Sequence, residues 1–334
     1  MGSSTIEPKF DKFSVSLAPR ARTHSDTWRV DDADVTEQAA LLALLSARST
    51  EQTRQEIATN VLAEGSALAV WRATQPPTLL DPVEELDQLT EAKQTIIAWR
   101  AAGLSMLTIA DDHYPTKLRE VHQAPALLFT KGTVVPKDRA VAVVGSRNAS
   151  AGGREFASQV ARSLVAEGIT VVAGLAAGID TAAHSAALAA GGRTVAVVGT
   201  GIDRYYPNEN RALQDQIGED GLVLSQFLPG SAPRSQHFPQ RNATMSGYSL
   251  ATVIVEAGEH SGTRIQARLA VEHGRPVVLT TSVLNNTDWA KELRHRPRVH
   301  IASTSEEVIS IVGELAREDL EVERALSPLG TASA

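Results

Sequence analysis

Four glycine-rich turns carry the residue types that could bind an anion. They are Gly145-Ser146-Arg147, Gly174–Asp180, Gly199–Asp203 and Gly258–Thr263. Glycine lets the backbone approach a ligand closely, and the free N–H groups at the start of a following helix attract negative charge. A single turn of this kind more often only reverses the chain. Four of them, with an arginine in the first, favour a site for phosphate groups.

A second stretch, Phe238-Pro239-Gln240-Arg241-Asn242, combines an aromatic ring with a guanidinium and two amides. Single-stranded nucleic acid is bound by such groups, because bases stack on aromatic rings and arginine pairs with phosphate. One stacked base contributes roughly 1–3 kcal/mol. The alternative is a buried phenylalanine and an arginine paired with a carboxylate, and the stretch taken alone favours that alternative.

Candidate catalytic groups are few. Asp180 and His184 are four residues apart, and a helix cap beside a packed histidine is the simpler interpretation of that spacing. Glu256, Glu259 and His260 lack the spacing of an HExxH metal site. The Walker A pattern is absent, and GxGxxG does not follow the first strand of the predicted sheet. We therefore predict no catalytic residue, no metal and no cofactor.

The composition indicates a globular protein. The chain has 334 residues, of which 43% are hydrophobic, and it contains no cysteine, which excludes disulfides and thiolate chemistry. Its net charge of −7 argues against indiscriminate nucleic-acid binding. The acidic excess lies outside residues 139–315, where every basic residue except Lys291 is an arginine suited to bidentate phosphate contacts. Local basic patches are thus compatible with the overall charge.

No apolar run is long enough to cross a bilayer, and residues 1–10 contain no signal-peptide core. We therefore expect a cytoplasmic protein without membrane contact.

Seven short apolar segments predict the sheet that would position the glycine-rich turns. Their continuous Val and Ile runs are typical of parallel strands buried on both faces, and helical segments separate most of them. The carboxyl ends of such strands meet at one edge, where ligands bind. The predicted strands are Ala140–Val144, Thr170–Ala173, Thr194–Val198, Leu222–Leu224, Thr252–Val255, Pro276–Leu279 and Val299–Ile301.

The pattern divides the chain into four parts. Residues 1–35 are expected to be a loose tail, and residues 36–132 a small helical N-terminal domain. Residues 138–317 form the predicted Rossmann-like α/β domain, a largely parallel sheet flanked by helices, whose last helix covers Ser305–Arg317. Residues 318–334 are expected to be a C-terminal tail.

The motifs taken together resemble the DNA-processing protein A (DprA/Smf) family over roughly Leu104 to Ile311. This resemblance implies a Rossmann-like domain that binds single-stranded DNA, forms a homodimer and has no enzymatic activity. It also implies help in loading a RecA-type recombinase during DNA uptake in natural transformation. The matching segments, in order, are Val144–Arg147, Gly174–Asp180 with Ala183-His184, Tyr206-Pro207, Phe238–Asn242, and Glu256-Ala257 with Ser261-Gly262.

The family resemblance implies DNA-binding roles for Arg147 and for Phe238, Arg241 and Asn242. Together with the glycine-rich turns, these give the set of residues that we expect to bind nucleic acid. The set is Gly145, Ser146, Arg147, Gly174, Gly178, Phe238, Gln240, Arg241, Asn242, Ser261, Gly262 and Thr263.

Four positions depart from the family pattern. Ala173 and Ala177 stand where the family usually has serine and arginine, Asn208 where it is often basic, and Ala243 where a second arginine is common. Each missing charge removes a phosphate contact, so weaker DNA binding is expected. A winged-helix segment, found in many members, is not expected after the last helix.

Two other functions fit the same fold. One is a nucleotide-binding sensor or a phosphoribohydrolase-like enzyme, although the residues after Gly262-Thr263 include no nearby carboxylate, which disfavours hydrolysis. The other is a protein-interaction module that keeps the fold and has lost its ligand, as Ala177, Asn208 and Ala243 would indicate.

Overall fold

Nine strands form one mixed sheet in the described part of the chain. The computed structural model describes residues 32–47, 52–75 and 89–326. The strands are β1 Ser105–Thr108, β2 Leu127–Gly132, β3 Ala140–Val144, β4 Thr170–Ala173, β5 Thr194–Val197, β6 Leu222–Ser225, β7 Ala251–Ile254, β8 Val277–Thr280 and β9 Val299–Ala302.

The strand order is β1-β2-β6-β5-β4-β3-β7-β8-β9. Pairing is parallel from β6 to β9, whereas β2 is antiparallel to both β1 and β6. Strands β3 to β8 are buried along their whole length, which explains their continuous apolar sequences. The predicted Rossmann-like, largely parallel sheet is confirmed, and its seven predicted strands match to within one or two residues.

Helices cover both faces of the sheet. Helix α7 packs on α8 and α14, and this layer encloses one apolar core, while α10 packs on α11 and α6 on the other side. The helices are α1 Asp32–Ser46, α2 Arg54–Glu64, α3 Ala67–Thr74, α5 Thr90–Ala101, α6 Thr116–Arg119, α7 Ala151–Ala166, α8 Ile179–Ala189, α9 Arg211–Asp220, α10 His237–Tyr248, α11 Gly262–Glu272, α12 Thr281–Asn286, α13 Asp288–Leu293 and α14 Ser305–Leu326.

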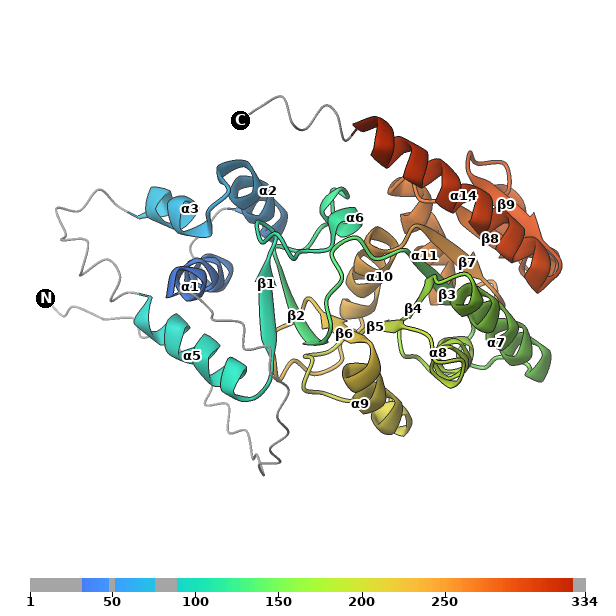
Figure 1. The fold of residues 1–334 in the computed structure, drawn as a ribbon, viewed down its shortest axis with the longest axis horizontal. Helices are drawn as coiled ribbons and strands as arrows, with labels where there is room; N and C mark the ends of the chain where they lie inside the picture. Colours follow the sequence, from blue (N-terminus) through green and yellow to red (C-terminus); the bar gives the residue numbers. More distant parts are fainter. Residues whose placement is uncertain (1–31, 48–51, 76–88, 327–334) are drawn as a thin grey trace, which may run out of the picture.

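Helices α1, α2, α3 and α5 gather at the β1 end of the molecule (Figure 1). Gln38 on α1 ties this group to the sheet, because its Nε2 donates to the Met106 carbonyl at 2.8 Å while Arg100 donates to its Oε1 at 2.9 Å. Thr53 and Glu56 form a reciprocal capping box that fixes the start of α2. The helical group is therefore attached by specific polar contacts as well as by apolar packing.

Residues 105–132 differ from the expected helical domain. They supply β1 and β2, and β2 joins the main sheet by pairing Phe129 with Ser225 of β6. The sequence did not indicate these strands, because β1 forms only by pairing with β2, and β2 depends in turn on β6, about a hundred residues away in the chain. The domain division at residue 132 remains a prediction, while the sheet itself crosses that boundary.

The last helix is longer than predicted. Helix α14 continues from Ser305 to Leu326, so residues 318–326 are helical and the expected tail from 318 is wrong in that part. Lys117 anchors this extension through an ion pair of 2.6 Å with Asp319. The first helix also begins inside the expected N-terminal tail, at Asp32. Residues 1–31 and 327–334 lie outside the described residues.

In the described ranges, no helix has the length and apolar character needed to span a membrane.

Asp138 joins several elements at the amino-terminal edge of the sheet. Its buried carboxylate accepts hydrogen bonds from Thr170 Oγ1 at 2.6 Å, Arg193 Nε at 3.0 Å and Tyr248 Oη at 2.8 Å. Burial, together with the charge of Asp138, raises the pKa of Tyr248 well above its usual value, so this hydroxyl remains a donor. The start of β4, the start of β5 and the end of α10 thus share one acceptor.

We predict that Asp138→Ala lowers the free energy of unfolding by about 2–4 kcal/mol, because it leaves two buried hydroxyls and the partly buried Arg193 guanidinium without this acceptor. Urea titration followed by circular dichroism measures the change. The control is Asp112→Ala at an exposed position, which is expected to stay within about 0.5 kcal/mol of the parent. Equal stability of the two variants would contradict the prediction.

Candidate nucleic-acid interface

Two of the glycine-rich turns interlock with each other and with Glu256, which follows β7, at the carboxyl edge of the sheet. Ser146 N donates to the Glu256 carbonyl at 2.7 Å, and Ile179 N donates to the Ser146 carbonyl at 3.2 Å. A Cβ at Gly145 would lie 2.5 Å from Ile179 Cγ1, and one at Gly178 would lie 2.3 Å from the Ser146 carbonyl oxygen. These glycines are therefore required for the turns to pack against one another.

Arg241 lies beneath these turns. Its side chain is buried, its Nη1 donates to the Val197 carbonyl at 3.1 Å, and a Cβ at Gly174 would lie only 1.2 Å from that nitrogen. Arg241 is expected to bind nucleic acid, but the structure places its guanidinium inside the protein and not on an open surface. Burial lowers the pKa of the Arg241 guanidinium, an effect that the charge of Asp180 opposes. Arg241 thus supports the turns from inside.

Asp180 and His184 are also internal. The Asp180 carboxylate accepts hydrogen bonds from Gly174 N at 2.9 Å and Ala176 N at 3.4 Å, which fixes the second turn. Burial raises the pKa of Asp180, while Arg241 acts in the opposite direction. His184 Nδ1 pairs with Thr194 Oγ1 at 2.7 Å, and burial lowers the pKa of its imidazole to about 3. Asp180 and His184 therefore stabilise the fold through internal hydrogen bonds.

An exposed cationic and aromatic surface lies above the turns. The Arg147 guanidinium carbon is 5.2 Å from the centre of the Phe238 ring, and the Tyr206 ring centre is 5.6 Å from that of Phe238. Phe238 sits close to the backbone of Gly199, where a Cβ would be 3.1 Å from its ring. Tyr206 is 40% exposed, so its ring is available to a ligand. We call Arg147, Phe238 and Tyr206 the stacking surface.

Tyr206 was not among the residues predicted to bind nucleic acid. The Tyr206-Pro207 pair was recognised as a family motif, and it is the sequence feature from which a role for the Tyr206 ring could have been predicted. Its contact with Phe238 comes from segments more than thirty residues apart, so sequence spacing could not predict it.

The fourth turn lies at the start of α11. Ser261 Oγ caps this helix by accepting from Thr263 N at 3.1 Å, and Asn242 Nδ2 donates to the Gly262 carbonyl at 3.5 Å. The α10 and α11 starts are therefore neighbours, as expected for one site. Thr263 and Asn242 are buried, whereas Gly262 is exposed.

The carboxylates near this turn are engaged by backbone groups. Glu256 accepts from Ser150 N at 3.0 Å, and Glu259 accepts from Asp288 N at 2.8 Å. The described part of the chain contains no cluster of His, Cys, Asp or Glu suited to a metal ion. This geometry gives no support to an acid–base pair built from Glu256 and Glu259.

The structure thus sorts the predicted residues by exposure. Arg147, Gln240 and Gly262 are exposed; Gly145, Ser146, Gly178, Phe238 and Ser261 are partly exposed; Gly174, Arg241, Asn242 and Thr263 are buried.

Comparison with known proteins identifies the family. The family model for DNA recombination-mediator protein A matches residues 105–313, which include the interlocked turns and the stacking surface. The chain belongs to this family. The resemblance inferred from the sequence motifs is therefore confirmed.

Two curated relatives carry the name DNA processing protein DprA. The one from Streptococcus pneumoniae is 48% identical over 171 residues, which cover 51% of this chain and 60% of the relative. The one from Bacillus subtilis is 33% identical over 235 residues, covering 65% of this chain and 79% of the relative. The match thus spans less than two thirds of the pneumococcal relative.

Solved structures agree on the fold. The X-ray structure of DprA from Streptococcus pneumoniae has a TM-score of 0.58 and 32% identity, covering 83% of this chain and 94% of that one. DNA processing protein A from Helicobacter pylori, solved for its single-stranded DNA binding mode, has a TM-score of 0.57 and 24% identity, covering 63% and 96%. These matches confirm the Rossmann-like DprA fold.

We predict that Gly174→Ala lowers the free energy of unfolding by about 1–3 kcal/mol, because the new methyl group would overlap the buried Arg241 guanidinium. Chemical denaturation measures the loss. The matched control is Gly258→Ala, where a Cβ would meet nothing within 4 Å. A loss at Gly258 as large as that at Gly174 would contradict the packing argument.

His184 is expected to make the protein less stable in acid. Its folded-state pKa of about 3 lies below the usual histidine value of 6.5, so the unfolded chain binds the proton more readily and stability falls as pH drops below 6.5. Between pH 7 and pH 5 this single group accounts for about 2 kcal/mol.

The measurement is urea denaturation of the parent and of His184→Gln at pH 7 and pH 5. The difference between the two pH values should shrink by about 2 kcal/mol in this variant. Replacing the exposed His295 by glutamine is the control and should leave the difference unchanged. An unaltered pH dependence in His184→Gln would show that the imidazole is not buried in its neutral form.

Proposed function

We propose that this protein binds single-stranded DNA across the carboxyl edge of its sheet and acts as a recombination mediator. The observation that carries the proposal is the exposed Arg147 guanidinium, 5.2 Å from the Phe238 ring centre at positions that fit the family. A base can stack on the Phe238 and Tyr206 rings while Arg147 pairs with a neighbouring phosphate. Membership of the family supports the same function, as does the single-stranded DNA binding described for the Helicobacter pylori protein.

The buried residues of the predicted set contribute indirectly. Arg241 and Gly174 keep the second turn in place, and Gly178 approaches the carbonyl groups of Ser146 and Arg147. We infer that these are positioning residues, which hold the stacking surface without touching the strand. Ser146, Gln240, Ser261 and Gly262 have polar groups at or near the surface that can contact the sugar-phosphate chain.

The downstream partners belong to the same proposal. We propose that the bound strand is passed to a RecA-type recombinase, and that the protein works as a cytoplasmic homodimer without enzymatic activity. The description of the family as a recombination mediator supports the transfer. Light scattering tests the dimer, and stimulation of recombinase filament assembly on single-stranded DNA tests the transfer.

We predict that Arg147→Ala weakens binding of an oligothymidylate and lowers the salt dependence, the slope of log K against log salt, by about 0.7, the value for one lost phosphate contact on a single strand. Fluorescence anisotropy at several salt concentrations measures both quantities. The matched control is Arg139→Ala, an exposed arginine before the amino end of β3 and so at the other edge of the sheet. Binding that is absent in the parent, or unchanged in Arg147→Ala, would overturn the proposal.

The opposite change is expected at Ala177. This residue is exposed in the second turn, next to Gly178, which contacts the backbone of Arg147. Ala177→Arg should therefore tighten oligothymidylate binding and raise the salt slope by about 0.7. Ala189→Arg, at the exposed far end of α8, is the control and should change neither by a comparable amount. Equal effects at both positions would indicate a general charge effect instead of a contact.

A further inference from the structure

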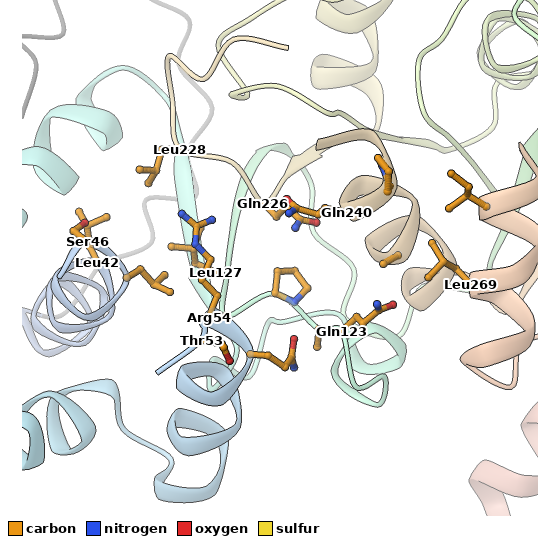
Figure 2. Close-up of a pocket in the computed structure, with 18 of the residues that line it drawn as sticks. Leu42, Ser46, Thr53, Arg54, Gln123, Leu127, Gln226, Leu228, Gln240 and Leu269 are labelled. Carbon is orange, nitrogen blue, oxygen red and sulfur yellow. The ribbon is translucent and has the colours of Figure 1, made fainter. Parts of the chain in front are cut away.

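A pocket of about 470 Å³ lies between the N-terminal helices and the sheet domain (Figure 2). Its volume is in the range of small-ligand sites, roughly 300–1,000 Å³. One wall comes from α1 and the start of α2, another from residues 123–127, and the remaining walls from α10 and α11 with residues 226–228. None of the residue positions in the stacking surface lines it, so the pocket is separate from the surface described above.

The pocket is rich in hydrogen-bond donors. Its described lining includes Arg54 and Arg268 and four glutamines, and contains no Asp or Glu. Figure 2 draws Arg54 from the start of α2 together with Gln123, Gln226 and Gln240. The capping box of Thr53 and Glu56 fixes the turn from which Arg54 projects. Such a site favours a ligand that carries acceptors or negative charge.

Two of the glutamines have their carbonyl oxygens occupied by the protein. Gln226 Oε1 accepts from the Thr244 hydroxyl, and Gln123 Oε1 is 3.0 Å from His273 Nε2. Burial lowers the pKa of His273 to about 4, so its ring is neutral, and the hydroxyl of Ser246 lies 3.1 Å from its Nδ1. With both oxygens engaged, the amide N–H groups of Gln123 and Gln226 remain to donate to a ligand.

The other walls are apolar and suit a flat ring. Leu127, Leu228, Leu269 and Pro239 line the pocket, and Ala243 leaves space that a longer side chain would fill. Apolar walls with a few placed donors are typical of sites for heterocyclic ligands. Thymine and guanine present carbonyl acceptors, and a phosphate would pair with the Arg54 guanidinium.

The pocket also adjoins the stacking surface through α10. Phe238 belongs to that surface, while the next two residues, Pro239 and Gln240, line the pocket. Arg54 is near enough to the start of α10 for its charge to act on His237. A strand that crosses Phe238 therefore passes close to the pocket, because Pro239 and Gln240 follow Phe238 directly in α10.

From these contacts we infer that the pocket binds a nucleotide unit, with a carbonyl-bearing base between its apolar walls and the phosphate on Arg54. The unit is either a free nucleoside monophosphate or one nucleotide of a bound strand, since both present the same base and phosphate. This site goes beyond the proposed function, which requires only the stacking surface. It gives the N-terminal helices a role, because Arg54, Gln55 and Leu42 complete the pocket.

The test titrates the full chain with thymidine monophosphate by calorimetry and with a fluorescent dodecathymidylate by anisotropy. Arg54→Ala removes the charge, and Ala243→Met fills the pocket without changing the charge. Arg54→Ala should weaken ligand binding about tenfold or more, the value for losing a hydrogen bond to a charged group. Ala243→Met should also weaken ligand binding, because the longer side chain takes up space that the ligand needs. Arg139→Ala is the matched arginine control, and circular dichroism confirms that each variant is folded.

The results distinguish a free nucleoside monophosphate from one nucleotide of a bound strand as the ligand of the pocket. Monophosphate binding that both variants weaken supports a free nucleotide as the ligand. Dodecathymidylate binding that both variants weaken, without monophosphate binding, supports one nucleotide of the strand. Ligand binding that neither variant changes, or the absence of both kinds of binding, overturns the inference.

The same titrations separate this inference from the proposed function. If Arg147→Ala leaves dodecathymidylate binding unchanged, the proposed DNA-binding role of the stacking surface is rejected. The effect of Arg54→Ala on thymidine monophosphate binding then still tests the nucleotide pocket. If Arg147→Ala weakens the oligonucleotide and the pocket variants affect neither ligand, the proposed function stands and the nucleotide pocket is rejected.

Discussion

The buried guanidinium of Arg241 is the constraint on which the ligand-facing edge depends. A charge inside a protein is stable only when hydrogen bonds and an opposite charge compensate it. Here the Val197 carbonyl accepts from the guanidinium, and the Asp180 carboxylate supplies the opposite charge. The same carboxylate holds the backbone of the second turn, so one buried pair of charges links α10, β5 and α8.

This arrangement explains why the glycines recur at this edge. Gly174 makes room for the guanidinium, and Gly145 and Gly178 let neighbouring turns touch through their backbones. The turns therefore form one packed layer, and the side chains that remain above it, chiefly Arg147, Phe238 and Tyr206, are presented on a rigid base. A rigid base matters for stacking, because each ring then loses little freedom when a ligand binds.

The stacking surface contains one basic residue, Arg147. Because Ala177, Asn208 and Ala243 carry no charge, aromatic stacking is expected to supply a larger share of the contact in the proposed interface. The donor-rich pocket beside α10 has a different composition, with two arginines, four glutamines and no carboxylate in its described lining. Arg54 of α2 thus places a positive charge in the pocket beside the stacking surface.

The α/β sheet, the glycine-rich edge and the family could be predicted from local sequence patterns: continuous Val and Ile runs, turn glycines and ordered short motifs. Strands such as Ala140–Val144 and Thr170–Ala173 were predicted to the residue. The start of helix α14 was predicted, but its end was placed too early, at Arg317. The extension is held by the ion pair between Asp319 and Lys117, a long-range contact that the local pattern does not show.

Which of the predicted residues are exposed at this edge depends on long-range packing that local patterns do not reveal. Arg147 and Arg241 are the same residue type in equally suggestive motifs, yet one is exposed over an aromatic ring and the other is buried below a turn. The difference arises from the space that Gly174 leaves and from the charge of Asp180, both distant from Arg241 in the chain. The strands within residues 105–132 and the pocket at Arg54 could not be predicted from the sequence for the same physical reason. Each is made by segments that meet only when the chain folds.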